Sequence, residues 1–224
     1  MDSLLPHLYS PYYLSEVAAA VTATVFFYKY KNSPIWLIMP ILWMAVIAET
    51  SGVLYVEFVY PNNNWIFNIY GLLFYAVFYK MVYNFVKDPM RRKIIIILSV
   101  AVLVVYIINA LVTDPLYAAL TYGKIAGTVV MVVHLMYAAI ESLKSARVFD
   151  LKESLPIVVF AGYLLIELTL IPVSLIRNMD LHIWSLDVYN GVNTILGVVL
   201  IIANSIFIIG FIWTKPSSHK GITS

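Results

Sequence analysis

Two glutamates lie inside long apolar segments, and each is followed by a similar aromatic and polar string. Trp65 follows Glu49 by 16 positions and opens W-I-F-N-I-Y, whereas Trp184 follows Glu167 by 17 positions and opens W-S-L-D-V-Y. A carboxylate that faces lipid is energetically costly, so we expect both glutamates to face the interior of a helix bundle. Ionisable groups at this depth are usually functional, and the pattern therefore predicts an intramembrane binding site.

Other polar side chains are expected to line the same site. Asp187, Asn190 and Thr194 are spaced by three and four positions, which places them on one face of a helix. Such a stripe either forms hydrogen bonds to neighbouring helices or lines a wet cavity. Together with the two acids, it favours a cavity open to the outer side. The predicted ligand-binding residues are Glu49, Glu167, Lys124, Asn68, Asp187, Tyr70, Tyr189, Glu16, Asn190 and Thr194.

The sequence lacks the residue sets that several kinds of catalysis and cofactor binding require. It has no cysteine, which excludes thiol catalysis and iron–sulfur clusters, and its four histidines form no metal-ligand set. No phosphate-binding loop, nucleophile elbow or H-E-x-x-H string occurs, and the last apolar segment has no lysine for a retinal Schiff base. We therefore predict no catalytic, cofactor or metal residue, and we expect His134 to be a hydrogen-bonded packing residue.

Composition predicts an all-α polytopic membrane protein. Hydrophobic residues make up 62% of the 224 residues and charged residues only 12%, about half the share that a soluble domain carries. The apolar blocks have the length of transmembrane helices, about 20 residues. Because the polar segments between them are short, residues 1–224 are expected to form a single membrane domain with no nucleic-acid partner. The seven predicted spans are 12–30, 33–58, 64–86, 92–113, 117–143, 154–176 and 186–213.

Basic residues lie at alternate junctions between these spans. Twelve of the fourteen Lys and Arg residues fall on one side, and cytoplasmic loops are enriched in positive charge. We therefore expect the N-terminus outside and the C-terminus in the cytoplasm. The first residues lack the basic region of a cleavable signal peptide, so the first block is expected to remain as a helix.

The loop at 87–93 is either a topology determinant beside anionic membrane lipids or a docking site for a cytoplasmic or membrane partner protein. Its basic residues are Lys87, Arg91, Arg92 and Lys93.

The repeated Glu–Trp–Tyr pattern also predicts an internal duplication. Residues 12–86 would correspond to residues 117–213, with the helix at 92–113 as a linker. Because three spans and a linker separate the two copies, both copies run in the same direction. This 3+1+3 parallel repeat would have a pseudo-two-fold axis along the membrane normal.

The string Glu49-Thr-Ser-Gly52, followed by Asn62-Asn-Asn-Trp-Ile-Phe-Asn-Ile-Tyr70, resembles a stretch of small seven-helix bacterial membrane proteins that have no assigned activity. Those proteins often carry a Glu and a Gly in the second span and a similar Asn-Trp-Asn-Tyr string at the start of the third. The resemblance implies a seven-helix protein, and we expect it in a bacterial inner membrane. In topology the chain also resembles seven-helix sensor input modules and 3+1+3 sugar transporters, but it lacks the Pro-Gln signature of the transporters.

Several functions are compatible with these features. The preferred one is binding of a small or lipid-like ligand in an outward-facing pocket, by a receptor-like protein or an accessory subunit that acts through a partner. A transporter or channel would use the acids for proton coupling and the repeats for alternating access. An intramembrane enzyme for a lipid or isoprenoid would use a protonated glutamate as general acid. A structural subunit would use the polar groups only to join helices. The ligand, the partner and the oligomeric state stay open at this point.

Overall fold

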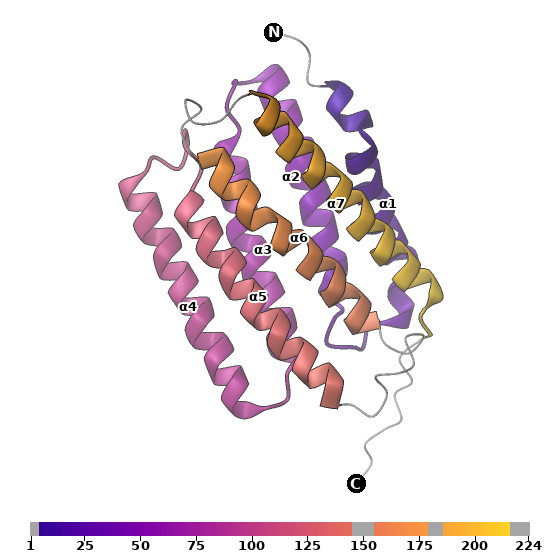
Figure 1. Ribbon diagram of the computed structural model, residues 1–224. Coiled ribbons are helices and arrows are strands. Elements are labelled where there is room, and N and C mark those ends of the chain that lie inside the picture. Colours follow the sequence, from indigo (N-terminus) through magenta and orange to yellow (C-terminus); the bar gives the residue numbers. More distant parts are fainter. Residues whose placement is uncertain (1–4, 145–154, 179–185, 216–224) are drawn as a thin grey trace.

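A computed structural model describes residues 5–144, 155–178 and 186–215, and all regular elements in these ranges are helices (Figure 1). The all-α prediction is therefore confirmed for the described residues. Two short 3-10 helices, η1 (Leu5–Tyr9) and η2 (Phe27–Lys29), flank the first α-helix. The α-helices are α1 (Pro11–Val25), α2 (Ile38–Phe58), α3 (Asn64–Phe85), α4 (Pro89–Val112), α5 (Thr121–Lys144), α6 (Leu155–Asn178) and α7 (Leu186–Trp213).

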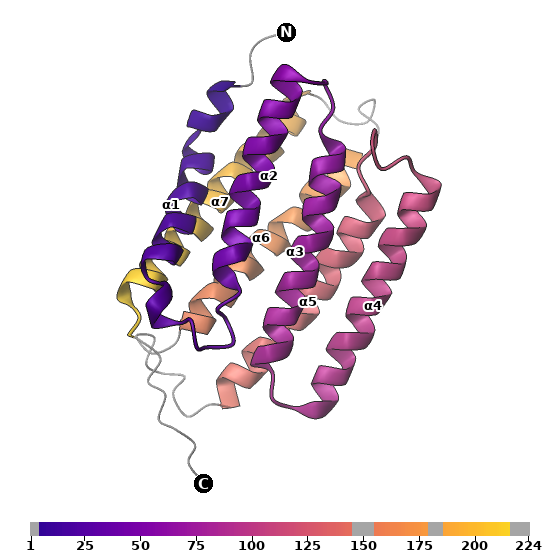
Figure 2. The ribbon, with the colours of Figure 1, turned by 180° about the vertical axis from the view of Figure 1, so that it is seen from behind.

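Six of the helices form a ring. Helices α1, α2, α3, α5, α6 and α7 pack against one another in that order, and α7 closes the ring against α1. Helix α4 lies at the edge of the bundle and packs against α3 and α5 (Figure 2). The start of α1 and the α2–α3 turn lie at one end, which we call the N-terminal end. The α3–α4 turn and the last turn of α7 lie at the opposite, C-terminal end (Figure 1).

Within the described part of the chain, six helices, α2 to α7, are long and apolar enough to cross a membrane, which indicates an integral membrane protein. Helix α1 has 15 residues. That is about 22 Å of helix, whereas the hydrocarbon core of a bilayer is about 30 Å thick. The predicted span at 12–30 instead leaves the α-helical conformation after Val25 and continues through η2. The seven-span count and the orientation of the termini remain predictions.

Two helices begin later than the sequence pattern predicts. The second span was expected from residue 33, but turns precede Ile38. The fifth was expected from residue 117, but a loop precedes Thr121. Both differences have one cause, because hydropathy does not distinguish an apolar turn from the first turn of a helix. Apart from the span at 12–30, whose α-helix ends at Val25, the remaining predicted spans agree with the observed helices to within a few residues.

Helix α4 begins at an Asp–Pro pair that is typical of a helix N-terminus. The carboxylate of Asp88 accepts hydrogen bonds from the backbone N–H groups of Met90 and Arg91, at 2.9 and 3.1 Å. Pro89 follows at a position where the helix has no partner for an N–H group. The hydrogen bond from Arg91, assisted by that of Met90 and by the Arg91 charge, holds the pKa of Asp88 below its ordinary value. The start of α4 is therefore determined by residues that are adjacent in the sequence.

An aromatic cluster fills the ring of helices. Tyr163 of α6 lies at its centre, with ring centroids 5.0 Å from Phe78, 5.0 Å from Phe207 and 6.0 Å from Phe74. Phe78 is 0% and Phe207 is 1% exposed. Such aromatic pairs contribute about 1 kcal/mol each beyond the burial of their area. The cluster joins α3, α6 and α7 across the ring, and Tyr70 extends it toward the N-terminal end, 5.8 Å from Phe74.

A close approach between α6 and α7 depends on a glycine. A Cβ atom at Gly162 would collide with the ring of Phe207, whose Cζ atom would be only 2.8 Å away, whereas no atom lies within 4 Å of a Cβ at Gly197. We expect Gly162→Ala to lower the free energy of unfolding by about 2 kcal/mol through overpacking. The matched change Gly197→Ala should leave it unchanged or raise it by about 0.5 kcal/mol, because alanine favours helix. Thermal unfolding of both variants in detergent measures the difference. Equal melting temperatures would contradict the close packing.

The ring is compatible with the predicted duplication. Helices α1 to α3 and α5 to α7 are two sets of three consecutive neighbours, and α4 lies outside them, where a linker helix would lie. Sequential packing of this kind also arises without duplication. The repeat of 12–86 in 117–213 therefore remains a prediction.

Candidate functional site

Three glutamates from three helices converge on Tyr70 of α3. Glu16 of α1, Glu49 of α2 and Glu167 of α6 all lie within electrostatic range of the Tyr70 hydroxyl. Glu16 and Glu49 also lie within range of each other, and Tyr163 lies within range of Tyr70, Glu167 and Glu16. We call Glu16, Glu49, Tyr70 and Glu167 the acid cluster. It lies on the N-terminal side of the aromatic core.

Two carboxylate oxygens of the acid cluster are buried without a partner. Glu167 is 1% exposed and receives a hydrogen bond from Thr128 of α5. Among the described residues, Oε2 of Glu167 and Oε2 of Glu16 have no hydrogen-bond partner although both atoms are buried. Buried polar atoms are almost always hydrogen-bonded, because an unsatisfied one costs free energy. The fold therefore holds two acceptors that a positively charged or proton-donating group would satisfy.

Glu49 forms the accessible side of the acid cluster. Its side chain is 28% exposed, and Oε2 lies 3.7 Å from Nε2 of His7 in η1. The hydroxyl of Tyr12 in α1 contacts the same imidazole. Burial lowers the pKa of His7, so at neutral pH the imidazole facing Glu49 is uncharged. Helix η1 thus lies beside Glu49 at the N-terminal end of the ring.

A hydrogen-bonded path leads from the acid cluster into α5 and α3. The Oγ1 atom of Thr128 lies 2.9 Å from the hydroxyl oxygen of Tyr75, and the Tyr75 hydroxyl donates to the backbone oxygen of Lys124 at 3.1 Å. One turn along α3, Tyr79 donates to the backbone oxygen of Gly127 at 2.7 Å. These bonds fix α5 against α3 and hold Thr128 in position to bind Glu167.

Asn68 does not belong to the acid cluster. Its amide nitrogen donates to the backbone oxygens of Pro115 and Ala118, at 2.8 and 2.9 Å, and its oxygen accepts from the backbone nitrogen of Leu120 at 3.0 Å. Its hydrogen-bonding capacity is used to hold the loop between α4 and α5. The structure gives Asn68 an architectural role.

The polar stripe of α7 does not face a single cavity. Asn190 and Thr194 are exposed, and the Thr194 hydroxyl donates to the backbone oxygen of Asn190 at 2.9 Å. Further along α7, Asn204 is buried and donates to the Ser15 hydroxyl of α1 at 3.0 Å. The side chains of the other two predicted residues of this region, Asp187 and Tyr189, lie outside the described part of the chain.

Lys124 lies between α5 and α3. Its Cε atom is 3.8 Å from the position that a Cβ atom of Gly71 would occupy, and the hydroxyl of Tyr106 lies 2.9 Å from the same position. The absence of a side chain at Gly71 therefore leaves room for both Lys124 and Tyr106 beside α3. Of the predicted site residues with described side chains, Glu16, Glu49, Tyr70 and Glu167 come together, whereas Asn68, Asn190 and Thr194 do not.

Sequence reasoning missed three contributors to this site. Thr128 and Tyr163 are single residues on apolar helices, and no spacing pattern distinguishes them from packing residues. His7 precedes the first helix, and only the course of η1 brings it to Glu49. The signal that identifies all three is proximity in the folded chain.

The prediction for His134 was half wrong. The side chain is 0% exposed and packs edge-on against the ring of Tyr79, with centroids 4.5 Å apart. Among the described residues, however, neither ring nitrogen has a hydrogen-bond partner.

The basic loop is partly used within the fold. Arg91 lies 3.7 Å from Glu141 of α5 and 3.9 Å from Asp88. Arg92 donates from Nε to the backbone oxygens of Tyr83 and Val86, at 3.3 and 2.7 Å. The side chains of Lys87 and Lys93 are exposed. These contacts join the α3–α4 turn to α5, and a docking role for the loop stays a prediction.

The described residues contain no group of three histidine, cysteine, aspartate or glutamate side chains that could hold a metal ion. Fold and site define a helical integral membrane protein with an intramembrane acid cluster. No protein-family model, no curated protein and no solved structure matches the chain. Its function has to be argued from the site itself.

Proposed function

We propose that this membrane protein binds a small organic cation, such as a protonated amine, at the acid cluster. The observation that carries the proposal is the pair of buried Oε2 atoms, on Glu16 and Glu167, that have no hydrogen-bond partner among the described residues. A buried carboxylate is stabilised most effectively by a positive charge that also donates hydrogen bonds. An ammonium group provides both.

The surroundings of the acids favour an organic cation over a metal ion. Among the described residues, no three side chains form a group that could hold a metal ion, whereas an organic cation with more than one N–H group could donate to both unpartnered Oε2 atoms. The rings of Tyr70 and Tyr163 border the cluster, and aromatic faces attract alkylammonium groups. Entry would occur past His7 and Glu49 at the N-terminal end, which is the predicted outer side of the membrane.

The test is thermal unfolding of the purified protein in detergent with a panel of alkylammonium ions. Each cation is compared with the alcohol of the same carbon skeleton, which has the same size without the charge. A ligand at 100 times its Kd should raise the melting temperature by about 5–10 °C. The alcohols should have no effect.

Variants locate the binding site. Glu167→Gln and Glu16→Gln should abolish the shift, because each keeps the shape of the side chain and removes its charge. Glu141→Gln is the matched control, since Glu141 pairs with Arg91 outside the acid cluster. A shift that the alcohols reproduce, or that survives in Glu167→Gln, would contradict the proposal.

A second candidate function, proton conduction, is favoured by the unpartnered His134. Thr128 donates to Glu167, its Oγ1 atom lies 2.9 Å from the hydroxyl oxygen of Tyr75, and the ring of Tyr79 packs against both Tyr75 and His134. Protons would pass from the acid cluster along these groups toward the C-terminal end. Proteoliposomes with an internal pH dye test this function, and His134→Phe should stop the flux. A wild-type protein that carries no protons would remove this candidate and leave cation binding untouched.

A receptor-like protein would have to pass the signal of ligand binding to a partner protein. The exposed Lys87 and Lys93 at the C-terminal end are the groups we propose for contact with a partner protein. Cross-linking from these two positions, with and without the bound cation, tests this part of the proposal.

A further inference from the structure

The interface between α3 and α4 contains a long groove, which lies on the outside of the ring of helices. Two cavities, of about 520 and 260 Å³, lie along it. Both are lined by Leu72 and Leu103, so they meet at this pair of residues. The larger one extends to Tyr83 and the smaller one to Trp65. We call the whole feature the α3–α4 groove.

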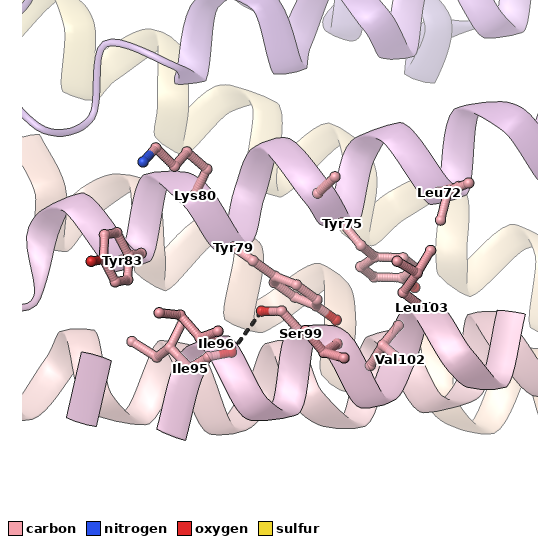
Figure 3. Close-up of a pocket in the computed structure, with 12 residues that line it drawn as sticks. Leu72, Tyr75, Tyr79, Lys80, Tyr83, Ile95, Ile96, Ser99, Val102 and Leu103 are labelled. Carbon is pink, nitrogen blue, oxygen red and sulfur yellow. Dashed lines mark hydrogen bonds between the residues drawn. The ribbon is translucent and has the colours of Figure 1, made fainter. Parts of the chain in front are cut away.

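The groove presents a hydrocarbon surface although it contains several polar residues. Figure 3 shows Tyr75 and Tyr79 on the side of α3 that faces α4, with Ser99 opposite them. The hydroxyls of both tyrosines bind to α5, and the Ser99 hydroxyl donates to the backbone oxygen of Ile95 at 2.7 Å. The rings of Tyr75 and Tyr79 stack with centroids 5.8 Å apart. A ligand in the groove would therefore contact mainly ring faces and alkyl groups.

Positive charge is concentrated at one end of the groove. Lys80 lines it and is exposed at its rim (Figure 3). Its Nζ atom lies 5.1 Å from the centre of the Tyr83 ring, and the Arg92 guanidinium lies 4.9 Å from the same ring. This end lies at the C-terminal end of the bundle, where Lys87 and Lys93 are also exposed. An amphiphile with an anionic head at this end matches the distribution of charge.

The length of the groove indicates which kind of hydrocarbon chain it would bind. From Tyr83 to Trp65 it follows residues 65–83 of α3, which is about 27 Å of helix. One leaflet of a bilayer contributes about 15 Å of hydrocarbon. The acyl chains of a phospholipid therefore end about 15 Å from the headgroup, near the middle of the bilayer. A single longer chain would fill the groove through both leaflets. We propose that the α3–α4 groove binds a polyisoprenoid phosphate, with its phosphate at Lys80 and its chain running toward Trp65.

Native mass spectrometry of the detergent-purified protein tests this site. The protein is incubated with equal amounts of a polyprenyl monophosphate, the uncharged polyprenol and phosphatidylglycerol. We expect the polyprenyl phosphate to be retained about tenfold over each competitor, which corresponds to one charge-assisted hydrogen bond and the additional buried chain.

Matched variants separate the head and chain sites. Lys80→Gln should remove the preference over polyprenol, whereas Lys80→Arg and the exposed control Lys31→Gln should keep it. Ala76→Phe should block binding of the chain, since Ala76 lines the groove, and Ala101→Phe on the exposed surface of α4 should not. Melting temperatures show that each variant is folded. Equal retention of phosphatidylglycerol, or unchanged retention in Ala76→Phe, would overturn the proposal.

Discussion

Glu167→Leu should raise the melting temperature of the protein in detergent by about 5 °C, which corresponds to about 2 kcal/mol. Glu167 is 1% exposed, and its Oε2 atom lacks a hydrogen-bond partner among the described residues. Leucine fills nearly the same volume and removes the cost of the unsatisfied oxygen. Groups that are kept for function at a cost in stability behave in this way. Glu49→Leu should have a smaller effect, because Glu49 is 28% exposed and faces His7.

Glu141→Leu is the control for this prediction. Glu141 is an acid on α5 that is more exposed than Glu167, with a side chain 14% exposed, and its Oε2 atom lies 3.7 Å from Nη1 of Arg91. Its removal leaves the Arg91 charge without that partner and should destabilise the protein by about 1–2 kcal/mol. If Glu167→Leu also melts below wild type, Glu167 is a structural group. The cation-binding proposal would then lose its main support.

Lys29→Met should destabilise the protein by about 2 kcal/mol, because Lys29 closes the last turn of α7 from a distant part of the chain. Its Nζ atom donates to the backbone oxygens of Phe211, Ile212 and Thr214, at 2.9, 2.8 and 2.9 Å. The last carbonyls of a helix have no partner within the helix, and a cation there also interacts favourably with the helix dipole. Methionine keeps the length of the side chain and removes all three bonds. The expected loss of stability is smaller than the sum of three hydrogen bonds, because water can bind to some of the carbonyl groups that Lys29 leaves.

Lys31→Met is the matched change, since Lys31 is an exposed lysine two positions further along. Thermal unfolding should show a loss of about 5 °C for Lys29→Met and no change for Lys31→Met. Hydrogen exchange should increase first in the last turn of α7. Equal melting temperatures for the two variants would show that Lys29 does not hold α7 against the end of α1.

The helices of this protein are largely predictable from hydropathy. The spans expected at 64–86 and 186–213 correspond to α3 (Asn64–Phe85) and α7 (Leu186–Trp213). The length of an apolar block is a local property, and it is sufficient to define a helix of this kind. The less accurate helix starts, at Ile38 and Thr121, follow apolar turns, and the loop before Thr121 is held by Asn68 through contacts that are distant in the sequence.

The candidate site was predictable only in part. The cost of burying a carboxylate led from the sequence to Glu16, Glu49 and Glu167, because that cost does not depend on the details of packing. The sequence also assigned Asn190 and Thr194 to the site through their shared helical face, but these side chains are exposed. Helical spacing shows which residues share a face, and it does not show which way that face points.

The sequence by itself determined the class of this protein, most of its helices and the expectation that its buried acids matter. Tertiary structure alone decided that these acids share one cluster with Tyr70, that Thr128 supports Glu167, and that Asn68 holds a loop. It also decided that α3 and α4 leave a groove between them. The reason is physical. The rotation of each helix and the choice of its neighbours depend on side chains that are far apart in the chain, and no local pattern encodes them.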